Sequence, residues 1–173
     1  AGGHDVIIGR RHFTDDAHDT TGLAGSGTLS VAEHRAYTHL AIHAMHSLYE
    51  ANRWVRYVAV FQNWLRPAGA SFDHLHKQLV GIDERGVTSQ LELQKVRVNP
   101  NLYNEMAVDY AAYQGLLVAS NEHAVAFAGF GHRYPTLEVY STSAMPEPWL
   151  MSHEEVDAVS DLVHALHAAT GAD

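Results

Sequence analysis

Two strand-like segments joined by a glycine-containing turn constrain this chain more than any other feature. Residues 55–62 are rich in valine and aromatic side chains, and residues 73–82 follow the turn around Gly69. Three polar side chains alternate along the second segment: His74, His76 and Gln78. Because successive side chains of a strand point to opposite faces, these three share one face and Lys77 lies on the other. The pattern predicts an antiparallel hairpin with a polar cluster on one face.

Helices and short strands are predicted along the rest of the chain. One capping box begins at Ser30 and opens a helix to about Asn52, and a second begins at Ser152 and opens a helix to about Ala169. We expect residues 83–98 to be a loop or an edge strand. The other predicted elements are strands at 5–9, 116–119, 124–128 and 137–141 and a helix at 101–114. Short turns join most adjacent strands, so we predict an α+β fold, a mainly antiparallel sheet with packed helices.

The composition excludes several classes of function. A hydrophobic fraction of 46% and a charged fraction of 18% are typical of a folded globular domain. The formal net charge of −9 argues against a nucleic-acid partner, because such binding relies on clustered lysine and arginine. No apolar run reaches the roughly 20 residues that cross a bilayer, so we expect no membrane partner. The chain has no cysteine, which fits a cytoplasmic protein without disulfides.

The hairpin residues resemble those of a known family. Three short motifs follow one another in order: Phe61-x-Asn63, Gly69-x-Ser71 and His74-x-His76-x-Gln78. They resemble the active-site strands of the galactose-1-phosphate uridylyltransferase-like family, a branch of the histidine-triad superfamily. The upstream segment from Gly3 to His12 resembles the strand that precedes the first long helix in that family. The resemblance implies a histidine-triad-like fold.

The resemblance covers most of the first of two related halves and the start of the second. We therefore expect residues 1–115 to form the first half and residues 116–173 to begin the second, packed into the same domain. The chain begins almost inside a strand and ends before the second half would present its own histidine-bearing strand. We expect it to be part of a longer protein.

The resemblance also implies the chemistry. His76 would be the nucleophile that takes a nucleoside monophosphate from a nucleotide sugar or nucleoside polyphosphate, forming a covalent nucleotidyl-histidine. Gln78 would donate to a phosphate oxygen and stabilise charge in the transition state. The turn and the strand end before it would bind the phosphate through Asn63, Gly69, Ala70 and Ser71. The implied protein is a nucleotidyltransferase of galactose metabolism that acts as a homodimer.

Two other functions fit the same residues. A dinucleoside polyphosphate phosphorylase or hydrolase would use the same nucleophile with a different acceptor. A non-catalytic nucleotide-binding module would keep the fold without the chemistry.

Zinc is the cofactor that the resemblance implies. In the resembling enzymes, the positions of His12 and His74 are zinc ligands, and a cysteine pair further upstream provides the other two. Two histidines cannot close a tetrahedral structural site, which takes four ligands. In this chain Asp15, Asp16 or His18 would have to complete the set.

Overall fold

The computed structural model describes residues 2–19 and 21–171, and the chain divides into two compact units. The first unit comprises residues 1–84 with 163–173, and the second comprises residues 85–162. Each unit contains helices and a three-stranded antiparallel sheet, so the predicted α+β class is confirmed. The halves predicted at 1–115 and 116–173 are segments expected to be related to each other in sequence and fold. The division into compact units does not test this relationship, so the two halves stay a prediction.

The first unit is built on a sheet whose central strand carries the predicted nucleophile. Its strands are β1 (Gly3–Ile8), β2 (Tyr57–Phe61) and β3 (His76–Ile82). They lie in the order β1-β3-β2, and both neighbours run antiparallel to β3. The predicted hairpin is therefore confirmed, although β3 begins at His76 and leaves His74 in the preceding turn. This turn also contains the short 3-10 helix η1 (Arg66–Ala68).

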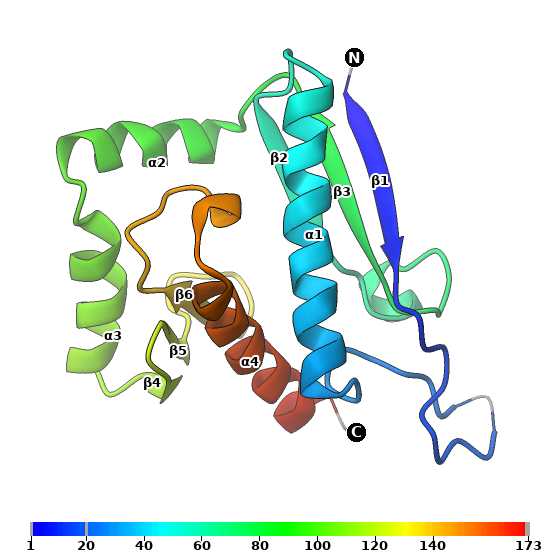
Figure 1. The fold of residues 1–173 in the computed structure, drawn as a ribbon. Coiled ribbons are helices and arrows are strands. Elements are labelled where there is room, and N and C mark those ends of the chain that lie inside the picture. The colour runs from blue at the N-terminus through cyan, green and yellow to red at the C-terminus, as the bar shows by residue number, and fades with distance from the viewer. Residues whose placement is uncertain (1, 20, 172–173) are drawn as a thin grey trace. The chain divides into compact units, whose positions relative to one another are not determined.

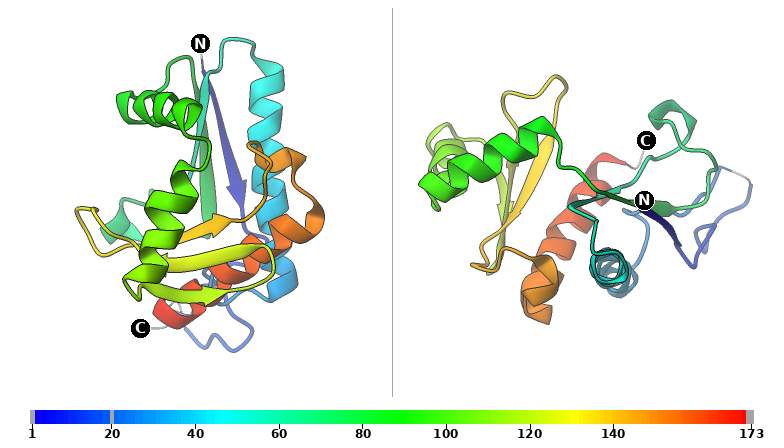
Figure 2. Two further views of the ribbon diagram at one scale, coloured as in Figure 1. Left: turned by 90° about the vertical axis from the view of Figure 1, so that its left-hand side faces the viewer. Right: turned by 90° about the horizontal axis from the view of Figure 1, so that it is seen from above.

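Helix α1 (Val31–Ala51) lies along one face of this sheet, as Figures 1 and 2 show. Its first turn is closed by the predicted capping box, in which the Glu33 amide donates to Ser30 Oγ at 3.2 Å and the Ser30 amide donates to Glu33 at 2.8 Å. The helix buries an apolar stripe that includes Tyr37, Ala41 and Leu48. These side chains pack with strand residues that include Leu79, which is fully buried.

The second unit has a sheet of its own. Its strands are β4 (Leu117–Ser120), β5 (Ala124–Ala128) and β6 (Leu137–Ser141), in that order. Phe127 is the fully buried centre of a small core with Ala107 and Ala111. These two alanines belong to the π-helix η2 (Asn104–Asp109) and to α3 (Tyr110–Tyr113), which together occupy the predicted helix at 101–114.

The final helix, α4 (His153–Thr170), follows the 3-10 helix η3 (Pro148–Leu150). Ser152 and Glu155 form the predicted capping box, with bonds of 2.8 and 3.2 Å. Within the described part of the chain, no helix is both long and apolar enough to cross a membrane.

The prediction for residues 83–98 was wrong, because residues 87–98 form helix α2 (Val87–Val98). From Leu91 onward apolar and polar residues nearly alternate, which is the period of a strand. None of the α2 side chains is fully buried, and Val87 and Val98 are 74% and 88% exposed. Because α2 buries no side chain completely, its sequence has no apolar stripe with the helical period from which the helix could be predicted.

Lys77 lies on the α1 face of β3, as predicted from the alternation. Its Nζ donates to Gln62 Oε1 at 2.9 Å and lies 5.1 Å from the ring centroid of Tyr37 on α1. Burial lowers the pKa of the Lys77 ammonium from 10.5 to about 8, and burial raises the pKa of the Tyr37 hydroxyl. The helix-covered face therefore holds a cation under α1.

We expect the stability of the protein to rise with pH between pH 8 and pH 10. In this window the unfolded chain keeps Lys77 protonated while the folded chain has released the proton, so the unfolded state binds more protons. The lowered pKa corresponds to a rise of about 1–3 kcal/mol in the free energy of unfolding. Above pH 10 ionisation of Tyr37 in the unfolded state opposes the rise.

Urea unfolding of the wild type, Lys77→Met and Lys95→Met measures this effect. Lys95 is the only other lysine and is exposed on α2, so its replacement is the matched control. The rise should disappear in Lys77→Met and persist in Lys95→Met. An equal rise in all three proteins would contradict the assignment to Lys77.

Candidate functional site

His76 is the first residue of β3 and is 2% exposed. Its Nδ1 lies 2.8 Å from the carbonyl oxygen of His74. A carbonyl oxygen only accepts, so Nδ1 carries the hydrogen and the neutral ring has its lone pair on Nε2. Nε2 is buried and has no hydrogen-bond partner among the described residues. The backbone contact thus fixes the tautomer in which Nε2 carries the lone pair, and no described residue uses that lone pair.

An aromatic side chain from the preceding turn covers the face of this ring. Phe72 stacks on His76 with ring centroids 3.9 Å apart and an angle of 25° between the planes. Phe72 is itself 42% exposed. Phe72 was not predicted to belong to the site, and its one signal in the sequence is an aromatic residue four positions before the second histidine.

Gln78 shares the sheet face of His76, as predicted. It pairs directly with Val6 on β1 and with Phe61 on β2, and residues paired in this way point to the same face. Val6 and Phe61 are 43% and 38% exposed, so the side of the sheet opposite α1 is open beside Gln78. No hydrogen bond within residues 2–19 and 21–171 engages the Gln78 side chain. Its amide is therefore free to donate to a ligand.

The turn before β3 brings together the residues predicted to bind phosphate. Gly69 has φ of 87°, a conformation that glycine adopts without strain, and a Cβ at this position would lie 3.8 Å from Asn63 Nδ2. The amides of Gly69 and Ala70 already donate to the carbonyl oxygens of Arg66 and Leu65. Neither the Asn63 amide nor the Ser71 hydroxyl has a hydrogen-bond partner in the described chain. These two side chains are therefore available to donate to a ligand.

The same turn contains backbone strain. Leu65 has φ of 60° and ψ of 173°, the only positive φ among the described residues other than glycine. Such a conformation costs about 1–3 kcal/mol and persists only where the surroundings enforce it. Here the Leu65 carbonyl oxygen accepts from both Ala68 and Ala70, which holds the turn closed.

The two predicted metal ligands lie side by side. The rings of His12 and His74 stack with centroids 4.5 Å apart, and His74 Nε2 lies 2.6 Å from the carbonyl oxygen of Gly9. Across the described residues, however, no group of three or more histidine, aspartate or glutamate side chains could hold a metal ion. The structure therefore does not gather Asp15, Asp16 or His18 with the two histidines, and zinc binding stays a prediction from the sequence. Two histidines do not fit a closed zinc site, and we derive no step through zinc.

The α1 side of the sheet contains a polar group that the sequence did not predict. Gln62 Oε1 accepts from Lys77, and the Gln62 amide exchanges hydrogen bonds with the buried Ser26 hydroxyl at 3.0 and 3.2 Å. Ser26 and Gln62 line a cavity of about 220 Å³ together with Trp64 and His167. Within it, Ser26 and Gln62 hydrogen-bond to each other.

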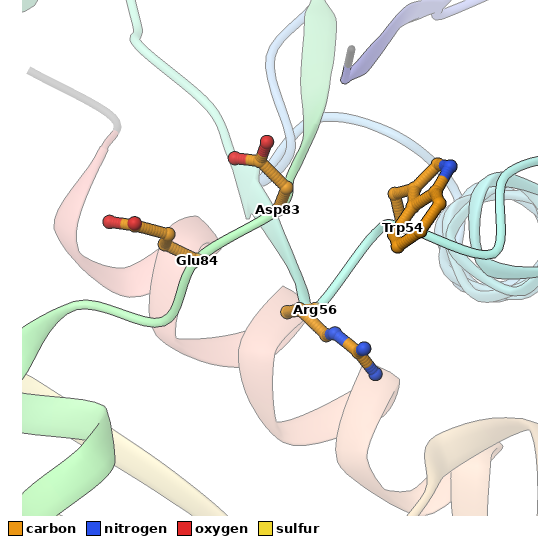
Figure 3. Close-up of a pocket in the computed structure, with 4 residues that line it drawn as sticks. All are labelled: Trp54, Arg56, Asp83 and Glu84. Atoms are coloured by element: carbon orange, nitrogen blue, oxygen red, sulfur yellow. The ribbon is translucent and has the colours of Figure 1, made fainter.

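A shallow depression lies at the other end of the hairpin, shown in Figure 3. It has a volume of about 450 Å³ and is lined by Trp54, Arg56, Asp83 and Glu84. In Figure 3 the two carboxylates point away from the guanidinium group of Arg56, and the four side chains do not converge on one point. Because β3 runs from His76 to Ile82, this depression adjoins the opposite end of the strand from His76. It does not form the candidate site.

Solved structures confirm the fold that the sequence resemblance implied. A galT-like protein from Arabidopsis thaliana has a TM-score of 0.73 and 16% identity, over 94% of this chain and 52% of that one. A uridylyltransferase mutant has a TM-score of 0.72 and 17% identity, over 94% and 52%. An ADP-glucose phosphorylase from Arabidopsis thaliana, solved with bound ADP-glucose, has a TM-score of 0.71 and 14% identity, over 94% and 49%.

These similarities show a shared fold. The chain spans about half the length of these structures. No curated protein matches it. One family covers the whole sequence, residues 1–173, and the chain belongs to this family, which is described as a domain of unknown function, DUF4921.

Proposed function

We propose that this protein transfers nucleoside monophosphate groups, with His76 as the nucleophile. One observation carries the proposal: Nδ1 of His76 is held by a backbone carbonyl oxygen, and Nε2 is buried without a partner. A buried polar atom without a hydrogen bond is rare in folded proteins and needs an explanation. A nitrogen reserved for bonding to phosphorus provides one.

The reaction begins on a nucleotide sugar. The lone pair of Nε2 attacks the phosphorus atom attached to the nucleoside, and the bond from that phosphorus to the bridging oxygen breaks. The bonding electrons leave with the sugar phosphate, while Nδ1 keeps its hydrogen and its bond to the His74 carbonyl oxygen. A second phosphate-bearing acceptor then attacks the same phosphorus and releases the neutral ring. The covalent nucleotidyl-histidine divides one transfer into two displacements.

We propose that three neutral side chains hold the transferred phosphate. Gln78 lies two residues beyond His76 on the same face, and Asn63 and Ser71 belong to the turn that leads into β3. All three have donors that no described residue engages. Donors that are already in position before the reaction stabilise the charge that develops on the phosphate oxygens, because these donors do not have to reorganise.

The acceptor distinguishes two candidate activities. With a sugar phosphate as acceptor the protein is a uridylyltransferase-like enzyme, and with inorganic phosphate it is a phosphorylase. The second candidate is included because the chain also shares its fold with an ADP-glucose phosphorylase. We propose both UDP-glucose and ADP-glucose as donors to be tested. A zinc ion, a homodimer and a cytoplasmic location stay predictions from the sequence.

We expect the wild-type protein to become labelled on His76. UDP-glucose and ADP-glucose would each carry radioactive phosphorus in the phosphate attached to the nucleoside. Label that survives denaturation and alkali but is lost in acid identifies a phosphorus–nitrogen bond, and peptide mapping locates it. Mixing labelled protein with inorganic phosphate or with a sugar phosphate then identifies the acceptor.

The matched variants are His76→Ala, His76→Gln and His43→Gln. Neither His76 variant should take up label, and the glutamine variant keeps most of the volume of the ring. His43 is exposed on α1, so its replacement should leave labelling unchanged. Equal labelling of His76→Gln and wild type, or no label on the wild type with either donor, would remove the proposed function.

Replacing Gln78 should slow labelling and leave the fold intact. Loss of one preorganised donor to a developing oxyanion typically lowers the rate by about a hundredfold or more. We expect this loss in the rate of label uptake by Gln78→Ala, and no change in Gln114→Ala, whose side chain is exposed after α3. The final extent of labelling distinguishes a slow reaction from an unfolded protein. A Gln78→Ala rate within twofold of wild type would contradict the assigned role.

A further inference from the structure

The aromatic ring on His76 is an unusual neighbour for a nucleophile. Phe72 belongs to the turn before β3 and to neither of the two hydrophobic core clusters. Its ring is 42% exposed on one side and lies against the nearly buried imidazole on the other, with centroids 3.9 Å apart. An exposed aromatic side chain that does not contribute to a core needs another reason to stack on a polar ring.

The proposed reaction supplies a charge at this position. When the Nε2 lone pair forms the bond to phosphorus, the electrons of the breaking phosphorus–oxygen bond leave with the sugar phosphate. Nδ1 keeps its hydrogen, because the His74 carbonyl oxygen cannot take it. The nucleotidylated ring therefore carries a positive charge until the acceptor attacks. The charge is spread over the imidazole face that Phe72 covers.

We infer that Phe72 stabilises the covalent nucleotidyl-histidine by placing its π face on the cationic imidazole ring. This inference rests on the proposed function of His76. A cation within about 6 Å of an aromatic centroid is attracted by the negative face of the ring, more strongly where water is excluded. The 3.9 Å separation and the 2% exposure of His76 meet both conditions.

Packing alone predicts a different behaviour. If Phe72 only fills space and fixes the orientation of the imidazole, an aliphatic side chain of similar bulk should serve as well. If the π face matters, tyrosine and tryptophan should replace phenylalanine, while leucine and methionine should not. Aromatic and aliphatic replacements of similar size therefore distinguish a π interaction from simple packing.

The experiment measures how much nucleotidyl-enzyme is present at equilibrium and how fast it is lost. Wild type, Phe72→Leu, Phe72→Met, Phe72→Tyr and Phe72→Trp are incubated with labelled UDP-glucose or ADP-glucose and a fixed excess of the released glucose phosphate. We expect the ratio of labelled to free enzyme to fall about five- to tenfold in the leucine and methionine variants. The tyrosine and tryptophan variants should keep the wild-type ratio.

Two controls isolate the effect. Phe130→Leu removes a phenylalanine of comparable exposure that packs on Tyr110 and Phe127 in the second unit, and it should leave the ratio unchanged. The proton resonances of the His76 ring report the stacking without any reaction. Ring currents from Phe72 should shift them upfield in wild type, and this shift should be lost in Phe72→Leu.

The outcomes separate this inference from the proposed function. Wild-type labelling on His76 with an unchanged ratio in the leucine and methionine variants would overturn the role of Phe72 and leave the nucleophile standing. Absence of wild-type label would overturn both. A lower ratio in the two aliphatic variants, with rescue by tyrosine or tryptophan, supports the inference. Should one aliphatic variant fail to fold in a thermal melt, the other decides.

Discussion

The alternation of side chains along β3 is the constraint on which both the stability of the first unit and its chemistry depend. Leu79 and Lys77 point to the face that α1 covers, whereas His76 and Gln78 point to the opposite face. A shift of one residue in register would bury Gln78 under α1 and expose Leu79. The pairing with β1 on one side and β2 on the other therefore does two things at once. It holds the core together, and it aims the polar residues at the open face.

The hairpin was predictable because its signals are local. Alternation placed His76 and Gln78 on one face and Lys77 on the other, and the structure confirms all three. The capping boxes at Ser30 and Ser152 predicted the starts of α1 and α4, since a cap depends only on residues within one turn. Strands β5 and β6 also begin and end where the sequence predicted. The placement of the phosphate-binding residues is described by the structure, but their role stays a prediction.

What the sequence did not predict depends on contacts between distant residues or on side chains outside regular elements. Helix α2 buries no side chain completely, so no helical stripe marked it in the sequence. The hydrogen bonds from Gln62 to Ser26 and from Lys77 to Gln62 join a loop, a strand end and a strand, and no spacing rule connects them. Phe72 shows a third limit. A turn residue has no periodicity, so no sequence pattern could predict its stacking on His76.

Under the proposed function, the site must bind a nucleotide sugar that carries several negative charges, so the positions of the charged groups around β3 matter. The strand has a lysine, but Lys77 lies on the far face, and burial lowers the pKa of its ammonium towards neutrality. The three proposed phosphate donors are two neutral amides and a hydroxyl, which bind phosphate oxygens without offering a full charge. The positive charge on the near face then arises on His76 itself, at the moment when the leaving group takes its electrons. Because this charge exists only after the bond has formed, it stabilises the intermediate more than the bound donor. An interaction that is stronger later in the reaction than in the bound donor raises the rate of the chemical step. The formal net charge of −9 is spread over the whole chain. The imidazolium is bonded directly to the phosphorus, so its attraction for the phosphate oxygens acts at the shortest distance available.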